Sequence, residues 1–366
     1  MIRFAWVQAR TQTAVAVAVL LAAAILAAIT GPRLLHLYDS VVATCGSRND
    51  CSSVTTAFLS SYRLMQVALP PVLLVAPALI GAFWGAPLVA RELETGTFRL
   101  AWTQGVTRQR WLAVKLTLTG LASMALAGFL SLILTWWFSP IDRVQLNQLT
   151  PAMFGVRGIT PIGYAAFAFA LGVAVGAIIR RTIPAMAATL VVFTGVRFAF
   201  TLWVRPYLIT PLRVTSALVM PTGNGPAPPP GRGAVKPGDL VVSDQTINGA
   251  GHVIGANGGI GPNGELGNIQ VTHGRVSLAG GDGVCPNKFP ALGGGPGRGV
   301  RGAGPPPTAI NSAIQECINR LGIRQVVTYQ PLSRYWPLQW DETLIFTGLA
   351  VILAVVCFWQ VRRRLT

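Results

Sequence analysis

The sequence predicts an all-α polytopic membrane protein with six transmembrane helices and a Gly/Pro-rich extracytoplasmic subdomain between helices 5 and 6. Three observations support this fold class. First, 52% of the 366 residues are hydrophobic and only 11% are charged, whereas soluble domains carry roughly 25% charged residues. Second, six apolar segments approach or exceed the ~20 residues that a helix needs to cross the bilayer core. Third, glycine and proline are concentrated in residues 221–307.

The six apolar segments run over residues 12–31, 67–90, 111–138, 160–179, 183–204 and 343–361. The first, preceded by Arg3 and Arg10, also has features of a signal peptide. Its length and the five later segments favour an uncleaved helix that ends at Pro32. The second contains four prolines, and each removes a helix hydrogen bond. We therefore expect a kink or a break in the second helix, buried against other helices.

Basic residues set the expected orientation, because short loops rich in Lys and Arg stay in the cytoplasm. Basic clusters precede helix 1, separate helices 2 and 3, separate helices 4 and 5, and follow helix 6. All four fall on one side of a six-helix arrangement, so both termini are expected in the cytoplasm. The expected organisation is residues 12–204 for helices 1–5, residues 205–342 for the outside subdomain, and residues 343–366 for helix 6 and a basic tail.

The composition also argues against several classes of protein. The net charge of +17 is explained by membrane topology, because no basic run is interleaved with aromatic residues as in a nucleic-acid binder. None of the three lysines fits a G-x-x-x-x-G-K-[ST] phosphate loop, and neither H-E-x-x-H nor G-x-S-x-G occurs in the sequence. We therefore expect no enzymatic activity, metal or cofactor in this chain, and no nucleic-acid partner.

Four cysteines fall in the segments expected outside the membrane, namely Cys45, Cys51, Cys285 and Cys317. An oxidising compartment favours two disulfides, Cys45–Cys51 and Cys285–Cys317, and four free thiols are the alternative. Within the long segment, "DLVVSDQTI" and "GNIQVTHGRVSL" alternate as short strands do. "TAINSAIQECINRLG" has the period of a short amphipathic helix. These patterns predict a small subdomain that the second disulfide pins.

Arg197 is the one charge well inside an apolar segment. Such a charge is a candidate for a substrate path, here for an anionic substrate. The interpretation that we favour is that its side chain snorkels to the outer interface beside Arg205. Trp136, Trp137 and Trp203 are expected to be ordinary interface anchors.

The connection between helices 2 and 3, residues 91–110, is unusually rich in charge. Arg91, Glu92 and Glu94 are expected to form ion pairs on the surface of a short amphipathic helix. Gly96 weakens a free helix by ~1 kcal/mol, so it marks a bend or a close backbone contact. The residues alone leave two interpretations open: a docking site for a soluble partner, or a solvated loop that only fixes topology.

The stretch "RELETGT" resembles the E-x-E-x-G-T signature that follows the second span of type-2 ABC transporter permeases, with Glu92, Glu94, Gly96 and Thr97 at the motif positions. "LAWTQGVTRQRWLAVKL", "IIRRTIPAMAATL" and "YQPLSRYWPLQW" are similar to a group of actinobacterial exporter permeases. The resemblance extends over all six apolar segments and is weakest over residues 221–307.

The resemblance implies that residues 91–110 form a coupling helix that docks into a separate ATP-binding subunit, where ATP and Mg²⁺ are held. It also implies a homodimer with a substrate path between the copies, and an interfacial helix at residues 1–11. The chain is then the permease subunit of an exporter in a bacterial cell membrane, with an open choice of substrate. The alternative is a non-transporting membrane anchor, immunity or sensor protein that binds a ligand through its outside domain.

This interpretation places Glu92 at the exposed membrane edge, facing the ATP-binding subunit. Glu92→Arg is then expected to uncouple the transporter at little cost in folding, because an exposed helix charge contributes only ~0.3–0.5 kcal/mol.

Overall fold

The computed structural model describes residues 2–42, 52–61, 63–96, 108–217, 235–256, 269–272, 275–278, 316, 319–320 and 322–364. The chain divides into two compact units. The helical unit comprises Met1–Leu208 and Ser333–Thr366, and the second unit comprises Ile209–Leu332.

Six helical segments of the first unit are long and apolar enough to cross a membrane. They are Ala14–Ser40, Arg63–Thr95, Leu112–Gln145, Thr160–Ile179, Thr182–Tyr207 and Leu332–Gln360. The predicted number of spans is therefore confirmed. Except for the fourth, each span begins or ends several residues beyond its predicted apolar segment, and this brings charged residues into the spans.

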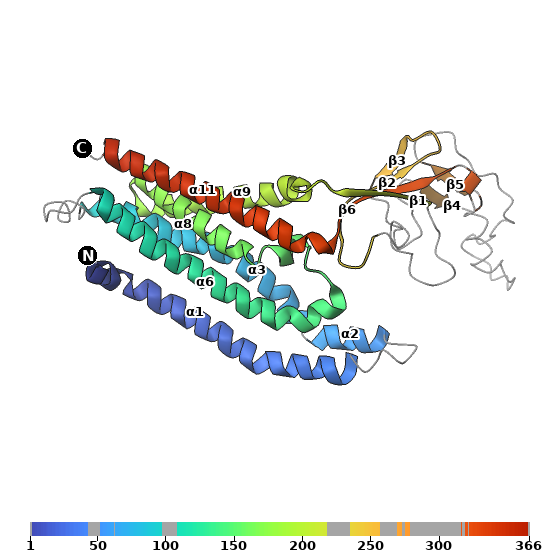
Figure 1. Ribbon diagram of the computed structural model, residues 1–366, viewed down its shortest axis with the longest axis horizontal. Helices are drawn as coiled ribbons and strands as arrows, with labels where there is room; N and C mark the ends of the chain where they lie inside the picture. The colour runs from blue at the N-terminus through green and yellow to red at the C-terminus, as the bar shows by residue number, and fades with distance from the viewer. Residues whose placement is uncertain are drawn as a thin grey trace, which may run out of the picture. The chain divides into compact units, whose positions relative to one another are not determined.

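The spans are built from α1 (Ile2–Leu37), α3 (Arg63–Ile80), α4 (Ala86–Thr95), α6 (Arg108–Gln145), α8 (Thr160–Ile179), α9 (Thr182–Ala199) and α11 (Tyr335–Arg364). Both chain termini lie at one end of the helical unit, beside the start of α6 (Figure 1). We call this end the terminal end. The opposite end carries α2 (Ser52–Ser61) and α7 (Pro151–Phe154), and we call it the α7 end.

Helix α8 is the central helix of this unit. It packs against α3, α4, α6, α9 and α11, and most of its side chains are buried. Small residues make this packing close: a Cβ on Gly172 would overlap the carbonyl oxygen of Gly81. Close approach through small residues is the usual basis of helix packing in membranes, so α8 and the second span are held as one body.

Prolines lie inside these helices without ending them. In the second span, a π-helical turn (η3, Gly81–Gly85) joins α3 to α4 just before Pro87. A π turn absorbs the interruption that proline causes, so the span is continuous and not broken. Pro32 lies inside α1, and the prediction that it ends the first helix is wrong. Residues 2–11 belong to the same helix, and their interfacial location stays a prediction.

Short helical turns complete the unit. They are η1 (Tyr38–Val42) and η4 (Phe200–Val204), which are π-helical, and η5 (Arg205–Tyr207) and η6 (Leu332–Arg334), which are 3₁₀ turns.

The second unit contains an antiparallel sheet with strand order β1-β6-β2-β3 and a separate hairpin β4–β5. The strands are β1 (Leu212–Ala217), β2 (Leu240–Ile247), β3 (Val253–Ala256), β4 (Ile269–Thr272), β5 (Arg275–Leu278) and β6 (Arg324–Gln330). β2, β4 and β5 lie where the alternating patterns predicted strands. The central strand β6, which pairs with both β1 and β2, was not predicted.

Two sequence predictions about this region stay untested. The paired cysteines Cys45, Cys51, Cys285 and Cys317 lie outside the described residues, as does most of the Gly/Pro-rich stretch 221–307. Among the cysteines, the structure describes Cys357, a buried free thiol in α11. Both disulfides and the extracytoplasmic location of the subdomain remain predictions.

Candidate functional site

Glu92 lies in the last turns of α4, at the terminal end, where its carboxylate forms an ion pair with the Lys115 ammonium of α6. Both side chains are buried, with 6% and 5% of their surface exposed. The expectation of an exposed Glu92 is therefore wrong. The reason is helical spacing: Glu92 follows the buried Val89 by three residues, and Lys115 follows the buried Leu112 by three residues. Residues three apart share a helix face.

Glu94 is exposed and bonds to the start of α9. Its Oε2 atom accepts hydrogen bonds from the Thr182 backbone N–H at 3.0 Å and from the Thr182 hydroxyl at 2.7 Å. Helix α9 has no capping side chain of its own, and a carboxylate at a helix N-terminus is favourable for the unpaired N–H groups and the helix dipole. The second span therefore caps the fifth.

The motif ends at Gly96, which terminates α4 in a left-handed conformation with φ of +70°. Glycine adopts this conformation without the steric cost that other residues meet. A Cβ at Gly96 would have no described atom within 4 Å, so backbone conformation and not close approach requires glycine here. Arg91 is exposed, and Thr97 lies outside the described residues. We call Arg91–Gly96 with Lys115 and Thr182 the α4 site.

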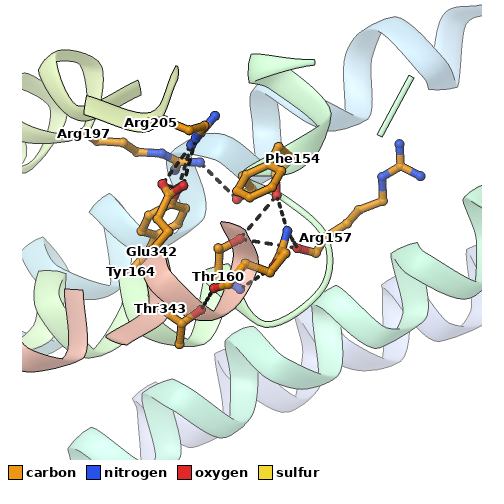
Figure 2. Close-up of polar contacts among 10 residues, drawn as sticks. Phe154, Arg157, Thr160, Tyr164, Arg197, Arg205, Glu342 and Thr343 are labelled. Carbon is orange, nitrogen blue, oxygen red and sulfur yellow. Dashed lines mark hydrogen bonds and ion pairs between the residues drawn. The ribbon is translucent and has the colours of Figure 1, made fainter. Parts of the chain in front are cut away.

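A second group of charges is buried at the α7 end (Figure 2). The Glu342 carboxylate of α11 accepts two hydrogen bonds from Arg205, from Nε and Nη2, both at 2.8 Å. It also accepts the hydroxyl of Tyr164 in α8. Glu342 is 1% exposed and Arg205 is 3% exposed. We call Tyr164, Arg197, Arg205 and Glu342 the Glu342 cluster.

Arg197 belongs to this cluster and does not snorkel to the interface, so the interpretation that the sequence favoured is wrong. Its guanidinium donates to the backbone carbonyls of Leu74 at 2.5 Å and Gly155 at 3.0 Å. It also lies over the Tyr164 ring, 4.3 Å from the centroid. Four residues at a spacing of four, Ala185, Thr189, Phe193 and Arg197, form the buried face of α9, and this spacing directs Arg197 inward.

Gln339 of α11 binds the loop between α7 and α8. Its Oε1 atom accepts the backbone N–H groups of Ile159 and Thr160, at 2.9 and 3.0 Å. Its Nε2 atom donates to the carbonyls of Phe154 and Arg157, at 3.1 and 3.2 Å. Gln339 is fully buried, so one amide satisfies the start of α8 and the loop before it.

Arg157 in the same loop is held by Asp142 of α6. Its Nη1 atom donates to both carboxylate oxygens, at 2.7 and 2.6 Å, and its guanidinium lies 4.6 Å from the centroid of the Phe138 ring. Together with the Glu342 cluster, this pair joins the second to sixth spans at the α7 end.

Comparison with known proteins decides the family. The sequence model of the family described as ABC-2 membrane transporter related matches residues 17–205, just over half of the chain. The chain belongs to this family. No curated protein and no solved structure matches it.

Membership of the ABC-2 membrane transporter related family makes the chain a multi-pass membrane subunit of an ABC transporter. The matched range contains the second, third and fourth spans and most of the first and fifth. It includes the α4 site and three members of the Glu342 cluster, while Glu342 itself lies beyond it. The cluster therefore joins the matched helices to the sixth span.

The sequence analysis of this ABC-2 family member missed Glu342 and placed Arg205 at the membrane interface, because the predicted apolar segments stopped at Val204 and began again at Thr343. Tyr164 lies inside the predicted segment 160–179, where nothing in the sequence singled it out. A signal for Glu342 was present. Leu338, Glu342 and Phe346 recur every four residues, as the buried face of a helix does, and all three are buried. Trp137 was also misassigned: it is 3% exposed and donates its indole N–H to Thr30 of α1 at 2.7 Å.

Proposed function

We propose that the chain is the permease subunit of an ABC exporter, driven by a separate ATP-binding subunit that docks at the α4 site. Two copies form the substrate path, and ATP and Mg²⁺ are held by the partner. The terminal end faces the cytoplasm of a bacterial cell, because this end carries the basic residues at the start of α1, from α4 to the start of α6, between α8 and α9, and at the end of α11.

The observation that carries the proposal is the connectivity of the α4 site. Glu92 binds Lys115 of the third span, and Glu94 binds Thr182 of the fifth span. The close contact of Gly172 with Gly81 of η3 fixes the same span to α8. A partner that displaces the end of α4 therefore displaces three other spans with it, which is what a coupling segment has to do.

Arg91 is the motif residue best placed to touch the partner. It is exposed on α4, whereas Glu92 is occupied inside the bundle. Charges at the rim of an interface affect association and salt dependence more than folding. The interface is therefore assigned to Arg91 and its exposed neighbours, and Glu92 supports the segment from within.

Photo-crosslinking in native membranes tests whether the α4 site contacts an ATP-binding subunit. A photo-crosslinking amino acid at Arg91 should yield an adduct with a P-loop protein, identified by mass spectrometry, and the same probe at Arg33 should not. Arg33 is an exposed arginine near the C-terminal end of α1, away from the terminal end of the helical unit. If Arg91 adducts contain no ATP-binding protein while the chain is normally abundant, the non-transporting anchor alternative is favoured.

A charge reversal separates docking from folding. Arg91→Glu should lower capture and transporter-dependent ATP hydrolysis about tenfold, which corresponds to ~1.4 kcal/mol, with unchanged abundance. Arg33→Glu is the matched control. Glu92→Arg should instead lower abundance, because it places two like charges together in a buried site. Normal abundance of Glu92→Arg would argue against the buried pair.

Orientation has a separate test. A cysteine replacing Arg33 should react with an impermeant thiol reagent in intact cells, and one replacing Arg91 should react only after the cells are opened. The unsubstituted chain is the background control, since it contains five cysteines. The reverse labelling pattern would place the α4 site outside and contradict the proposal.

A further inference from the structure

A cavity of about 420 Å³ opens at the α7 end of the helical unit, between α2, α3, the end of α6 and α7. Its lining residues are Thr56, Leu59, Ser60, Arg63, Gln66, Val67, Gln145, Asn147 and Met153. None of them belongs to the α4 site or to the Glu342 cluster. The function proposed above therefore assigns no role to this cavity.

The polar wall of this cavity is fixed by a buried ion pair. The Asn147 Oδ1 atom accepts a hydrogen bond from Arg157 Nη2 at 3.2 Å, and Arg157 is itself bound by Asp142. The Asn147 amide then donates to Gln145 Oε1 at 2.9 Å. With its oxygen engaged in this way, the Gln145 side chain has its NH₂ group left to offer to a ligand.

The mouth of the cavity carries a positive charge. Arg63 is exposed, and among the described residues it has no ion pair or hydrogen bond. The nine lining residues include no Asp or Glu. A guanidinium is suited to phosphate because its planar donors match phosphate oxygens. Charge complementarity thus selects an anionic group.

The remaining wall is apolar and continues onto the surface of α3. Leu59, Val67 and Met153 line the cavity. Leu64 and Val67 are 82% and 65% exposed on α3, at the start of a span that is long and apolar enough to cross a membrane. Arg63 is the first residue of that span, at the depth where basic side chains meet lipid headgroups. A ligand with its anion at Arg63 has apolar surface on which to lay a chain.

We propose that this cavity binds one anionic phospholipid of the surrounding bilayer, with the headgroup phosphate at Arg63 and Gln145 and the start of an acyl chain along Val67 and Leu64. A lipid fits better than free phosphate, because the cavity combines one cation with apolar surface that runs on into the membrane. The site does not depend on the ATP-binding subunit.

Native mass spectrometry of the full-length, delipidated protein tests the site, with dioleoylphosphatidylglycerol and dioleoylphosphatidylcholine as probes. The anionic lipid should bind with the higher occupancy. Arg63→Gln should weaken its binding about tenfold, which is the effect of losing one charge-assisted hydrogen bond of roughly 1.5 kcal/mol. Arg33→Gln, an exposed arginine outside the cavity, should leave binding unchanged.

A second pair of variants tests the cavity without removing charge. Val67→Trp places a large side chain in the cavity and should lower lipid occupancy. Val72→Trp, at an exposed position on the same helix outside the lining, should leave lipid occupancy unchanged.

Equal binding by wild type, Arg63→Gln and Val67→Trp would overturn the proposal. Displacement of the lipid by millimolar inorganic phosphate or glycerol phosphate would overturn the choice of a lipid and leave a soluble anion site.

Discussion

The two ends of the helical unit both carry helix caps and ion pairs that join different spans, but these groups differ in burial and in charge. At each end, a helix begins without a capping side chain of its own and receives one from another span. Helix α8 is capped by Gln339 of α11, which is fully buried, and helix α9 is capped by Glu94 of α4, which is exposed. A buried charge without a partner is costly, so the buried cap is a neutral amide and the exposed cap is a carboxylate.

The ion pairs differ in the same way. At the α7 end, Glu342 is bound by the rigid fork of Arg205 and by Tyr164, deep between three spans. At the terminal end, Glu92 is bound by Lys115, whose flexible stem lies about two turns from the start of α6. The comparison indicates that the α7 end is fixed by many coupled bonds. At the terminal end, the Glu92–Lys115 pair is buried, while water or a partner protein can replace the exposed bonds from Thr182 to Glu94.

Breaking the ion pairs should give the largest difference in lost stability between the two ends. Glu342→Gln should destabilise the helical unit by about 4 kcal/mol, because it leaves the Arg205 charge buried without a carboxylate. Glu92→Gln should cost about 2 kcal/mol, since Lys115 can extend toward water. Denaturation of the purified protein in mixed micelles, followed by circular dichroism, measures both.

A double variant is the control for this pair. Glu342→Leu with Arg205→Met should recover part of the loss, because removing both buried charges avoids an unpaired one. Equal losses for Glu342→Gln and Glu92→Gln would contradict the contrast between the two ends.

Removing the helix caps should give the second-largest difference in lost stability between the two ends. Gln339→Leu should cost about 3 kcal/mol, because it leaves two buried N–H groups and two carbonyls short of a partner. Glu94→Leu should cost less, because water can bind the exposed Thr182 N–H in its place. The same denaturation assay applies, with hydrogen exchange at the starts of α8 and α9 as the local readout. A larger loss for Glu94→Leu would reverse the comparison.

Alanine substitution at two glycines, one at each end, should give the smallest difference in lost stability. Gly96 and Gly158 both have positive φ, +70° and +71°, so alanine at either is strained by about 1 kcal/mol. At Gly158, a Cβ would also lie 2.6 Å from Gln339 Oε1, which disturbs the α8 cap. Gly158→Ala should therefore lower the denaturation midpoint more than Gly96→Ala. Gly96→Asn should be nearly neutral, since asparagine tolerates this conformation, and a large loss there would indicate a side-chain clash.

The sequence by itself determined the membrane class, the six spans and the position of the E-x-E-x-G-T motif after the second span. These follow from local properties: apolar length decides whether a helix can cross the bilayer, and glycine marks the end of α4. The strands β2, β4 and β5 were also predicted, because alternation within one strand is a local pattern. The central strand β6 was missed, because its place depends on pairing with two distant strands.

Only the tertiary structure decided which charges are buried and what they bind. Glu92 and Glu94 are two residues apart, yet one points to Lys115 and the other to Thr182, so the motif alone cannot separate an internal ion pair from an exposed cap. Arg197 was expected at the interface, and Glu342 was overlooked. Their partners lie 42 and 137 residues away in the chain, at Gly155 and Arg205. Burial of a charge depends on whether distant groups arrive to satisfy it, and that information lies in the packing of the helices and not in any one of them.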